Sequence, residues 1–175
     1  GDVIADLLMR IQLEKVGGEF QGSVVAHLKG NGLSKGVNRL TFDQKGRLWV
    51  GLTNRGWAKG QKGLQVVTFG GKAGQTIHSI GLAKDGFIVR FTQPVSEVKA
   101  EQVEVERWVY QYTNRYNAGK RQHEKNLAVK SVQVAPDKKS VHIAVDLKTD
   151  HVYGIKLKNL GLKHDTGYYT LNRLR

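Results

Sequence analysis

Residues 37–53 carry the pattern that most constrains the fold of this chain. Apolar side chains recur there at every second position on both sides of a short polar stretch, namely at Leu40, Phe42, Leu48 and Val50. Alternation with a period of two is typical of a β-strand with one buried face. The polar stretch ends in Gly46, which can adopt the positive φ that tight turns require. The segment therefore predicts a β-hairpin, which is followed by an exposed loop.

The same alternation runs through the rest of the chain, whereas the 3.6-residue period of a helix is nearly absent. Only residues 1–10 are ambiguous, because their apolar side chains would also suit one face of a short helix. The glycine-rich stretch at residues 70–74 is the best boundary between two domains, 1–75 and 76–175. Besides the hairpin, strands are expected at 11–15, 20–28, 64–69, 76–82, 86–92, 103–112, 127–134, 140–146 and 151–158. The predicted fold class is all-β.

The second domain has the strand density of a β-sandwich. Six or seven short strands within about 100 residues, separated by turn signals, are typical of immunoglobulin-like or fibronectin-like sandwiches. An aromatic row on one face of a strand, Trp108, Tyr110 and Tyr112, is expected to be buried. The remaining core residues are expected to be Phe87, Val89, Phe91, Val141, Ile143 and Val145.

Several motifs resemble one protein family, in the same order along the chain. The run Asp-x-x-Gly-x-Leu-aromatic-Val-Gly that begins at Asp43, with its extension Thr-Asn-Arg-Gly-Trp, looks like a β-propeller blade. It is similar to the glucose/sorbosone dehydrogenase-like propellers of bacterial envelopes. Residues 85–95, which include Asp-Gly-Phe and Phe-Thr-Gln-Pro-Val, resemble the segment that follows the propeller in those proteins. Residues 109–112 and 168–172 match that family's ending.

The resemblance implies that domain 1–75 is the last blade or blades of a propeller. Proteins of this kind are exported, so it implies a periplasmic, envelope or secreted location. They are often joined to cytochrome c modules, and their better-understood relatives use pyrroloquinoline quinone. This chain has room for about one or two blades, and it contains no cysteine and hence no haem-attachment motif. We therefore expect a piece of a larger protein that holds no cofactor and performs no catalysis by itself.

The formal net charge of +13 raises the question of a nucleic-acid ligand. Lysine and arginine residues are spread over the whole chain, and the densest group, residues 120–125, includes an acid. No nucleic-acid-binding signature accompanies them. A solvated basic surface is therefore the preferred interpretation, and a basic surface that faces an anionic lipid, glycan or acidic partner domain is an alternative. No apolar run approaches the roughly 20 residues that span a bilayer, so no transmembrane segment is expected.

One cluster of residues is a candidate ligand site. Asn54, Arg55 and Trp57 follow a predicted strand end, where propellers bind ligands. Arginine offers a planar donor fork for a carboxylate, and tryptophan offers a stacking face for a sugar or quinone ring. A structural role for these residues is the alternative. Glu104 and Glu106 share a strand face and are interpreted as ion-pair partners, while the six histidines show no metal-ligand spacing.

The leading functional prediction is thus a non-autonomous C-terminal part of a sorbosone/glucose dehydrogenase-like envelope protein that acts on carbohydrate. Its partners would be the remainder of a larger propeller or a cytochrome c module. The alternative is a non-catalytic β module that binds carbohydrate or a partner protein. A basic nucleic-acid binder ranks third.

Overall fold

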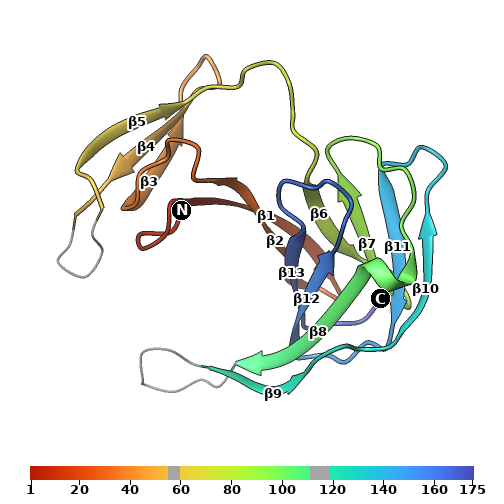
Figure 1. The fold of residues 1–175 in the computed structure, drawn as a ribbon. Helices are drawn as coiled ribbons and strands as arrows, with labels where there is room; N and C mark the ends of the chain where they lie inside the picture. The colour runs from red at the N-terminus through yellow and green to blue at the C-terminus, as the bar shows by residue number, and fades with distance from the viewer. Residues whose placement is uncertain (55–59, 111–118) are drawn as a thin grey trace. The chain divides into compact units, whose positions relative to one another are not determined.

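The computed structural model describes residues 1–54, 60–110 and 119–175, and they form an all-β protein, as predicted (Figure 1). Thirteen strands in the described residues make three sheets with antiparallel pairing. The described part contains no α-helix and a single 3-10 turn, η1 (Ala100–Gln102). None of its helical segments is long and apolar enough to cross a membrane.

The chain folds into two compact units. The first comprises residues 1–10 and 26–73, and the second comprises residues 11–25 and 74–175. The hairpin of β1 (Leu7–Val16) and β2 (Glu19–Lys29) therefore contributes residues to both units. The ambiguous segment at residues 1–10 is not helical: it makes a turn and enters β1 at Leu7. The division into domains 1–75 and 76–175 stays a prediction.

The first unit contains the predicted hairpin. Its three-stranded sheet consists of β3 (Val37–Phe42), β4 (Leu48–Leu52) and β5 (Gly63–Val67), in that order. Gly46 adopts a φ of 72° in the β3–β4 turn. Leu48 and Val50 are buried in a small core with Leu8, Leu33 and Val37. The alternation of apolar residues thus places one face of β4 in this core, as the sequence predicts. The corresponding residues of β3 do not follow it, because Leu40 and Phe42 are exposed on an edge strand.

Asp43 organises that turn. Its carboxylate accepts hydrogen bonds from the indole Nε1 of Trp49 at 3.0 Å, from Arg47 Nε at 2.7 Å and from the backbone amides of Lys45 and Arg47. The bond from Trp49, together with those from Arg47 and Lys45, holds the pKa of Asp43 well below its ordinary value. The Asp-x-x-Gly-x-Leu-Trp motif therefore stabilises the turn between β3 and β4.

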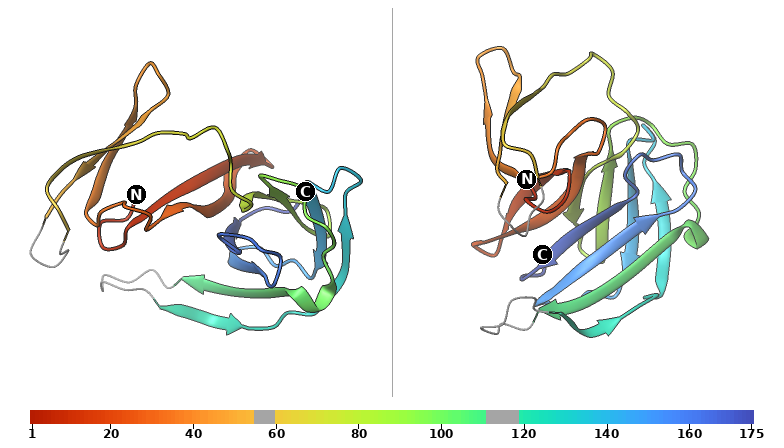
Figure 2. Two further views of the ribbon diagram at one scale, coloured as in Figure 1. Left: turned by 45° about the horizontal axis from the view of Figure 1, so that its top comes forward. Right: turned by 60° about the vertical axis from the view of Figure 1, so that its left-hand side comes forward.

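Two sheets build the second unit. The six-stranded sheet has the order β1-β2-β13-β12-β8-β9, and the four-stranded sheet has the order β10-β11-β7-β6. Figure 2 shows the two sheets of this unit face to face. The bounds of the strands not yet given are β6 (Ile77–Leu82), β7 (Gly86–Phe91), β8 (Val103–Tyr110), β9 (Lys120–Glu124), β10 (Val129–Val134), β11 (Ser140–Val145), β12 (His151–Leu157) and β13 (Thr166–Leu171).

One hydrophobic core lies between these sheets. All six predicted core residues of β7 and β11 are buried in it, which confirms that prediction. Phe87 packs against Tyr153 and Tyr169, with ring centroids 4.9 and 5.2 Å apart. The predicted aromatic row is buried only in part: Trp108 is 2% exposed, but Tyr110 is 51% exposed, and Tyr112 lies outside the described residues. Trp108 and Tyr110 are on the same face of β8, away from this core, and Tyr110 is the more exposed of the two because it is the last residue of the strand.

A buried polar network holds β13 in register beside β2. The Tyr169 hydroxyl donates to Glu14 at 2.6 Å and accepts from the Gln21 side-chain amide at 2.9 Å. The side-chain oxygen Oε1 of Gln21 accepts from the backbone amides of Asn172 and Arg173. Burial and the bond to Glu14 raise the pKa of Tyr169 above its ordinary value. Because β13 is fixed in this way, the direction of its neighbouring side chain Tyr168 is fixed as well.

Candidate functional site

The candidate site lies on the face of the six-stranded sheet that points away from the core. Along β8, β12 and β13, residues of one parity enter the core, as Val105, Ile155 and Tyr169 do. Residues of the other parity are directed to the opposite face because successive strand side chains alternate in direction. These residues are Glu104, Glu106, Gly154, Lys156, Thr166 and Tyr168.

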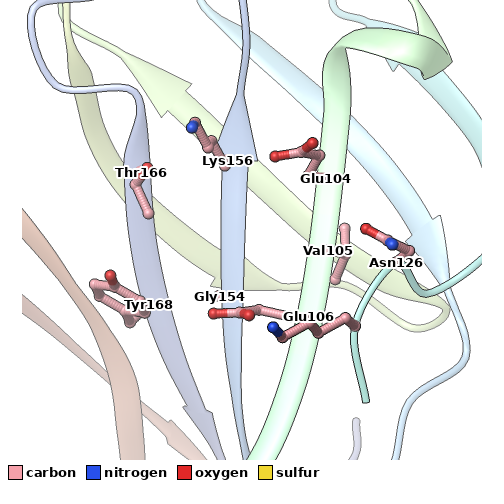
Figure 3. Close-up of a pocket in the computed structure, with 9 residues that line it drawn as sticks. Glu104, Val105, Glu106, Asn126, Gly154, Lys156, Thr166 and Tyr168 are labelled. Atoms are coloured by element: carbon pink, nitrogen blue, oxygen red, sulfur yellow. The ribbon is translucent and has the colours of Figure 1, made fainter. Parts of the chain in front are cut away.

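Strand register arranges these residues in two rows (Figure 3). Thr166, Lys156 and Glu104 are opposite one another on β13, β12 and β8. Tyr168, Gly154 and Glu106 form the neighbouring row. Cross-strand neighbours of this kind lie close enough for their side chains to share a ligand. The two rows line a pocket of about 390 Å³, which we call the outer-face pocket.

Gly154 makes the pocket hollow between Tyr168 and Glu106. A Cβ atom at this position would lie 3.0 Å from Glu106 Cγ and 3.2 Å from Trp108 Cζ3. Any larger residue would therefore displace both neighbours and fill the middle of the row. The absence of a side chain here creates the space that the flanking polar groups surround.

Residues after β9 form the remaining wall. The backbone amide of Leu127 donates to the carbonyl oxygen of Val105 at 2.8 Å, so this segment runs beside β8. Asn126 adopts a φ of 54°, a left-handed conformation that asparagine tolerates better than most residues. Lys125 and Asn126 both line the outer-face pocket. The pocket therefore offers an ammonium and an amide in addition to the aromatic ring of Tyr168.

An aromatic cluster adjoins the second row. The Trp108 ring meets those of Tyr168 and Tyr110 edge-on, with centroids 5.9 and 6.2 Å away. Lys120 Nζ lies 3.8 Å from the Trp108 ring centroid, a cation–π contact. Tyr168 remains 40% exposed, so Trp108 supports an aromatic ring that is available to a ligand. The buried Trp108 Nε1 has no hydrogen-bond partner in the part of the chain that the structure describes.

Both carboxylates of the pocket are ion-paired, as the sequence predicts. Glu106 accepts from Lys120 Nζ at 2.6 Å and from His123 Nε2 at 2.7 Å, and Glu104 accepts from Lys158 Nζ at 2.8 Å. Partial burial alone would raise the pKa of Glu106, but the bonds from Lys120 and His123 outweigh it and lower this pKa. The bond from Lys158 lowers the pKa of Glu104. Both groups are therefore ionised at neutral pH.

These lowered pKa values predict how stability depends on pH. A carboxylate whose pKa is lower in the folded state stabilises the fold above its unfolded pKa of about 4.3. This contribution is lost as the pH falls through the folded pKa values. We expect the E104Q/E106Q double variant to lose less unfolding free energy than the wild-type protein between pH 6 and pH 3, as measured by urea denaturation. E101Q, which removes a carboxylate without an ion pair in the described residues, is the control. Parallel pH profiles for the double variant and the wild type would contradict the assignment.

The predicted ligand residues are only partly described. Asn54 is exposed just beyond the end of β4, and none of the described pockets includes it. Arg55 and Trp57 lie outside the described residues, so this site stays a prediction. Among the histidines, His123 bonds Glu106 and His142 bonds Asp85 at 2.9 Å. Within residues 1–54, 60–110 and 119–175, no group of three or more metal-ligating side chains is present.

Sequence reasoning missed the outer-face pocket because it did not assign β13. In Thr166–Leu171, Gly167, Tyr169 and Leu171 are on the core face, and Thr166 and Tyr168 are on the other face. This alternation is the sequence signal that would have predicted the strand.

Comparisons with protein-family models, with curated proteins and with solved structures found no match to this chain.

Proposed function

We propose that this chain is a non-catalytic β module that binds carbohydrate in the outer-face pocket. The observation that carries the proposal is the half-exposed ring of Tyr168 beside the hollow over Gly154. An exposed aromatic ring offers an apolar surface for the C–H face of a sugar ring. Around it, Glu104, Asn126 and Thr166 supply acceptors and donors for hydroxyl groups. A concave surface that has an aromatic wall and a small number of polar groups is typical of a small-molecule site.

The electrostatics favour binding over hydrolysis. Glycoside hydrolysis by two carboxyl groups requires one of them to be protonated, so that it can donate a proton to the leaving group. In this pocket the pKa values of Glu104 and Glu106 are both lowered. Both side chains are also engaged by lysines. A pair of ionised, neutralised carboxylates accepts hydrogen bonds from sugar hydroxyls but supplies no general acid.

The wider assignment is that the chain is the C-terminal part of a sorbosone/glucose dehydrogenase-like envelope protein. In this proposal β3, β4 and β5 belong to a terminal propeller blade, and the two-sheet unit is an immunoglobulin-like sandwich. The edge strands of the three-stranded sheet support it: Phe42 on β3 is 71% exposed and Leu64 on β5 is 70% exposed. Apolar side chains on open edge strands are suited to neighbouring sheets. Pyrroloquinoline quinone, the sugar substrate and any cytochrome c module would then belong to the parent protein, in the periplasm or envelope.

Tyr168→Ala tests carbohydrate binding. We expect the wild-type chain to bind at least one of cellotriose, xylotriose and trigalacturonate in isothermal titration calorimetry. Y168A should weaken this binding roughly tenfold or more, because the stacking surface is lost. The matched control is T170A, which truncates an exposed residue of the same strand outside the pocket. Equal affinities for Y168A and the wild type, or no binding of any of the three sugars by the wild type, would contradict the proposal.

A further inference from the structure

The outer-face pocket carries more positive charge than its carboxylates neutralise. Four charged side chains line it: Glu104, Glu106, Lys125 and Lys156. The carboxylates already have lysine partners outside the lining, because Lys158 bonds Glu104 and Lys120 bonds Glu106. In the described residues, neither Lys125 nor Lys156 makes an ion pair. Lys156 attracts Glu104 at longer range and helps to lower the pKa of that carboxyl. Neither ammonium group is held in an ion pair, however, so both are available to a ligand.

These two lysines lie on different elements that approach the same hollow. Lys156 stands on β12 between Thr166 and Glu104, as Figure 3 shows. Lys125 belongs to the segment after β9, which the bond from Leu127 to Val105 holds beside β8. Both side chains are exposed, so neither must lose a buried partner to bind an anion. The adjacent amide of Asn126 and hydroxyl of Thr166 can donate further hydrogen bonds to a carboxylate.

We propose that the ligand of the outer-face pocket is an acidic glycan, an oligosaccharide of uronic acid units. This inference rests on the proposed carbohydrate binding. The sugar ring stacks on Tyr168 over Gly154, and its carboxylate is bound by Lys156 and Lys125. The net charge of +13 adds a long-range attraction for a polyanionic chain. Exposed ion pairs are individually weak, and two of them together correspond to a preference of roughly tenfold over a neutral sugar of the same shape.

The test compares trigalacturonate with its fully methyl-esterified form, which keeps the sugar rings and removes the charges. Isothermal titration calorimetry at about 0.1 M salt should show roughly tenfold tighter binding of the acid by the wild-type chain. The K125Q/K156Q double variant should lose most of this preference, because only the screened long-range attraction of the remaining charge favours the acid. K84Q is the control, because Lys84 is an exposed lysine of the β6–β7 turn outside the pocket. It should keep the full preference for the acid.

The outcomes separate this inference from the proposed function. Equal binding of acid and ester by the wild type overturns the acidic specificity but leaves carbohydrate binding in place. A loss of preference in K84Q equal to that in the double variant also overturns it, because the preference would then come from overall charge. Binding of neither form, nor of any neutral sugar, overturns the proposed function itself.

Discussion

Replacing Trp108 with alanine is expected to lower the free energy of unfolding by about 3–5 kcal/mol, the usual cost of removing a buried large aromatic side chain. The indole is 2% exposed and is enclosed by Tyr110, Tyr168, His123 and Lys120. Its removal leaves a cavity beneath Tyr168, so we also expect weaker carbohydrate binding. Urea denaturation followed by circular dichroism measures the first effect.

Trp108→Phe is the matched control for that change. Phenylalanine keeps most of the ring contacts, and the indole Nε1 that it lacks has no partner in the described residues. We therefore expect W108F to cost about 1–2 kcal/mol, well below the alanine variant. A W108A variant within about 1 kcal/mol of the wild type would show that the indole does not support this face.

Replacing Gly154 with valine is expected to abolish carbohydrate binding. The new side chain would occupy the hollow between Tyr168 and Glu106, and its Cβ would meet Glu106 and Trp108 at 3.0 and 3.2 Å. Overpacking of this kind typically costs about 1–3 kcal/mol of stability, so the fold should survive. Calorimetric titration at a temperature where circular dichroism shows a folded variant separates the two effects.

Gly74→Val is the control for the valine substitution. A Cβ at Gly74 meets no atom within 4 Å, and this residue lies outside the pocket. G74V should keep both the stability and the affinity of the wild type. If G154V binds the sugar as tightly as G74V does, the ligand does not occupy the hollow over Gly154.

The hairpin at residues 37–53 and the strands β6, β7, β8, β10, β11 and β12 could be predicted from the sequence. Apolar residues recur at or near every second position in them, as Phe87, Val89 and Phe91 do, and these three side chains are buried. The pairing of Glu104 and Glu106 with cations was also predictable, because both residues share the polar face of β8 in a basic chain. The strand β9 was not predictable in this way, because Lys120–Glu124 contains only polar residues and pairs through its backbone with β8.

The sequence by itself determined the all-β class, the hairpin turn at Gly46 and the core face of β4, β7 and β11, because these depend on residues within a few positions of one another. Only the tertiary structure decided which strands are neighbours. Tyr168, Gly154 and Glu106 form one row although they come from three separate strands, and Lys125 reaches the same pocket from a fourth segment. No local pattern encodes that juxtaposition, since it follows from long-range strand pairing and from the polar network of Glu14, Gln21 and Tyr169 that holds β13 in place.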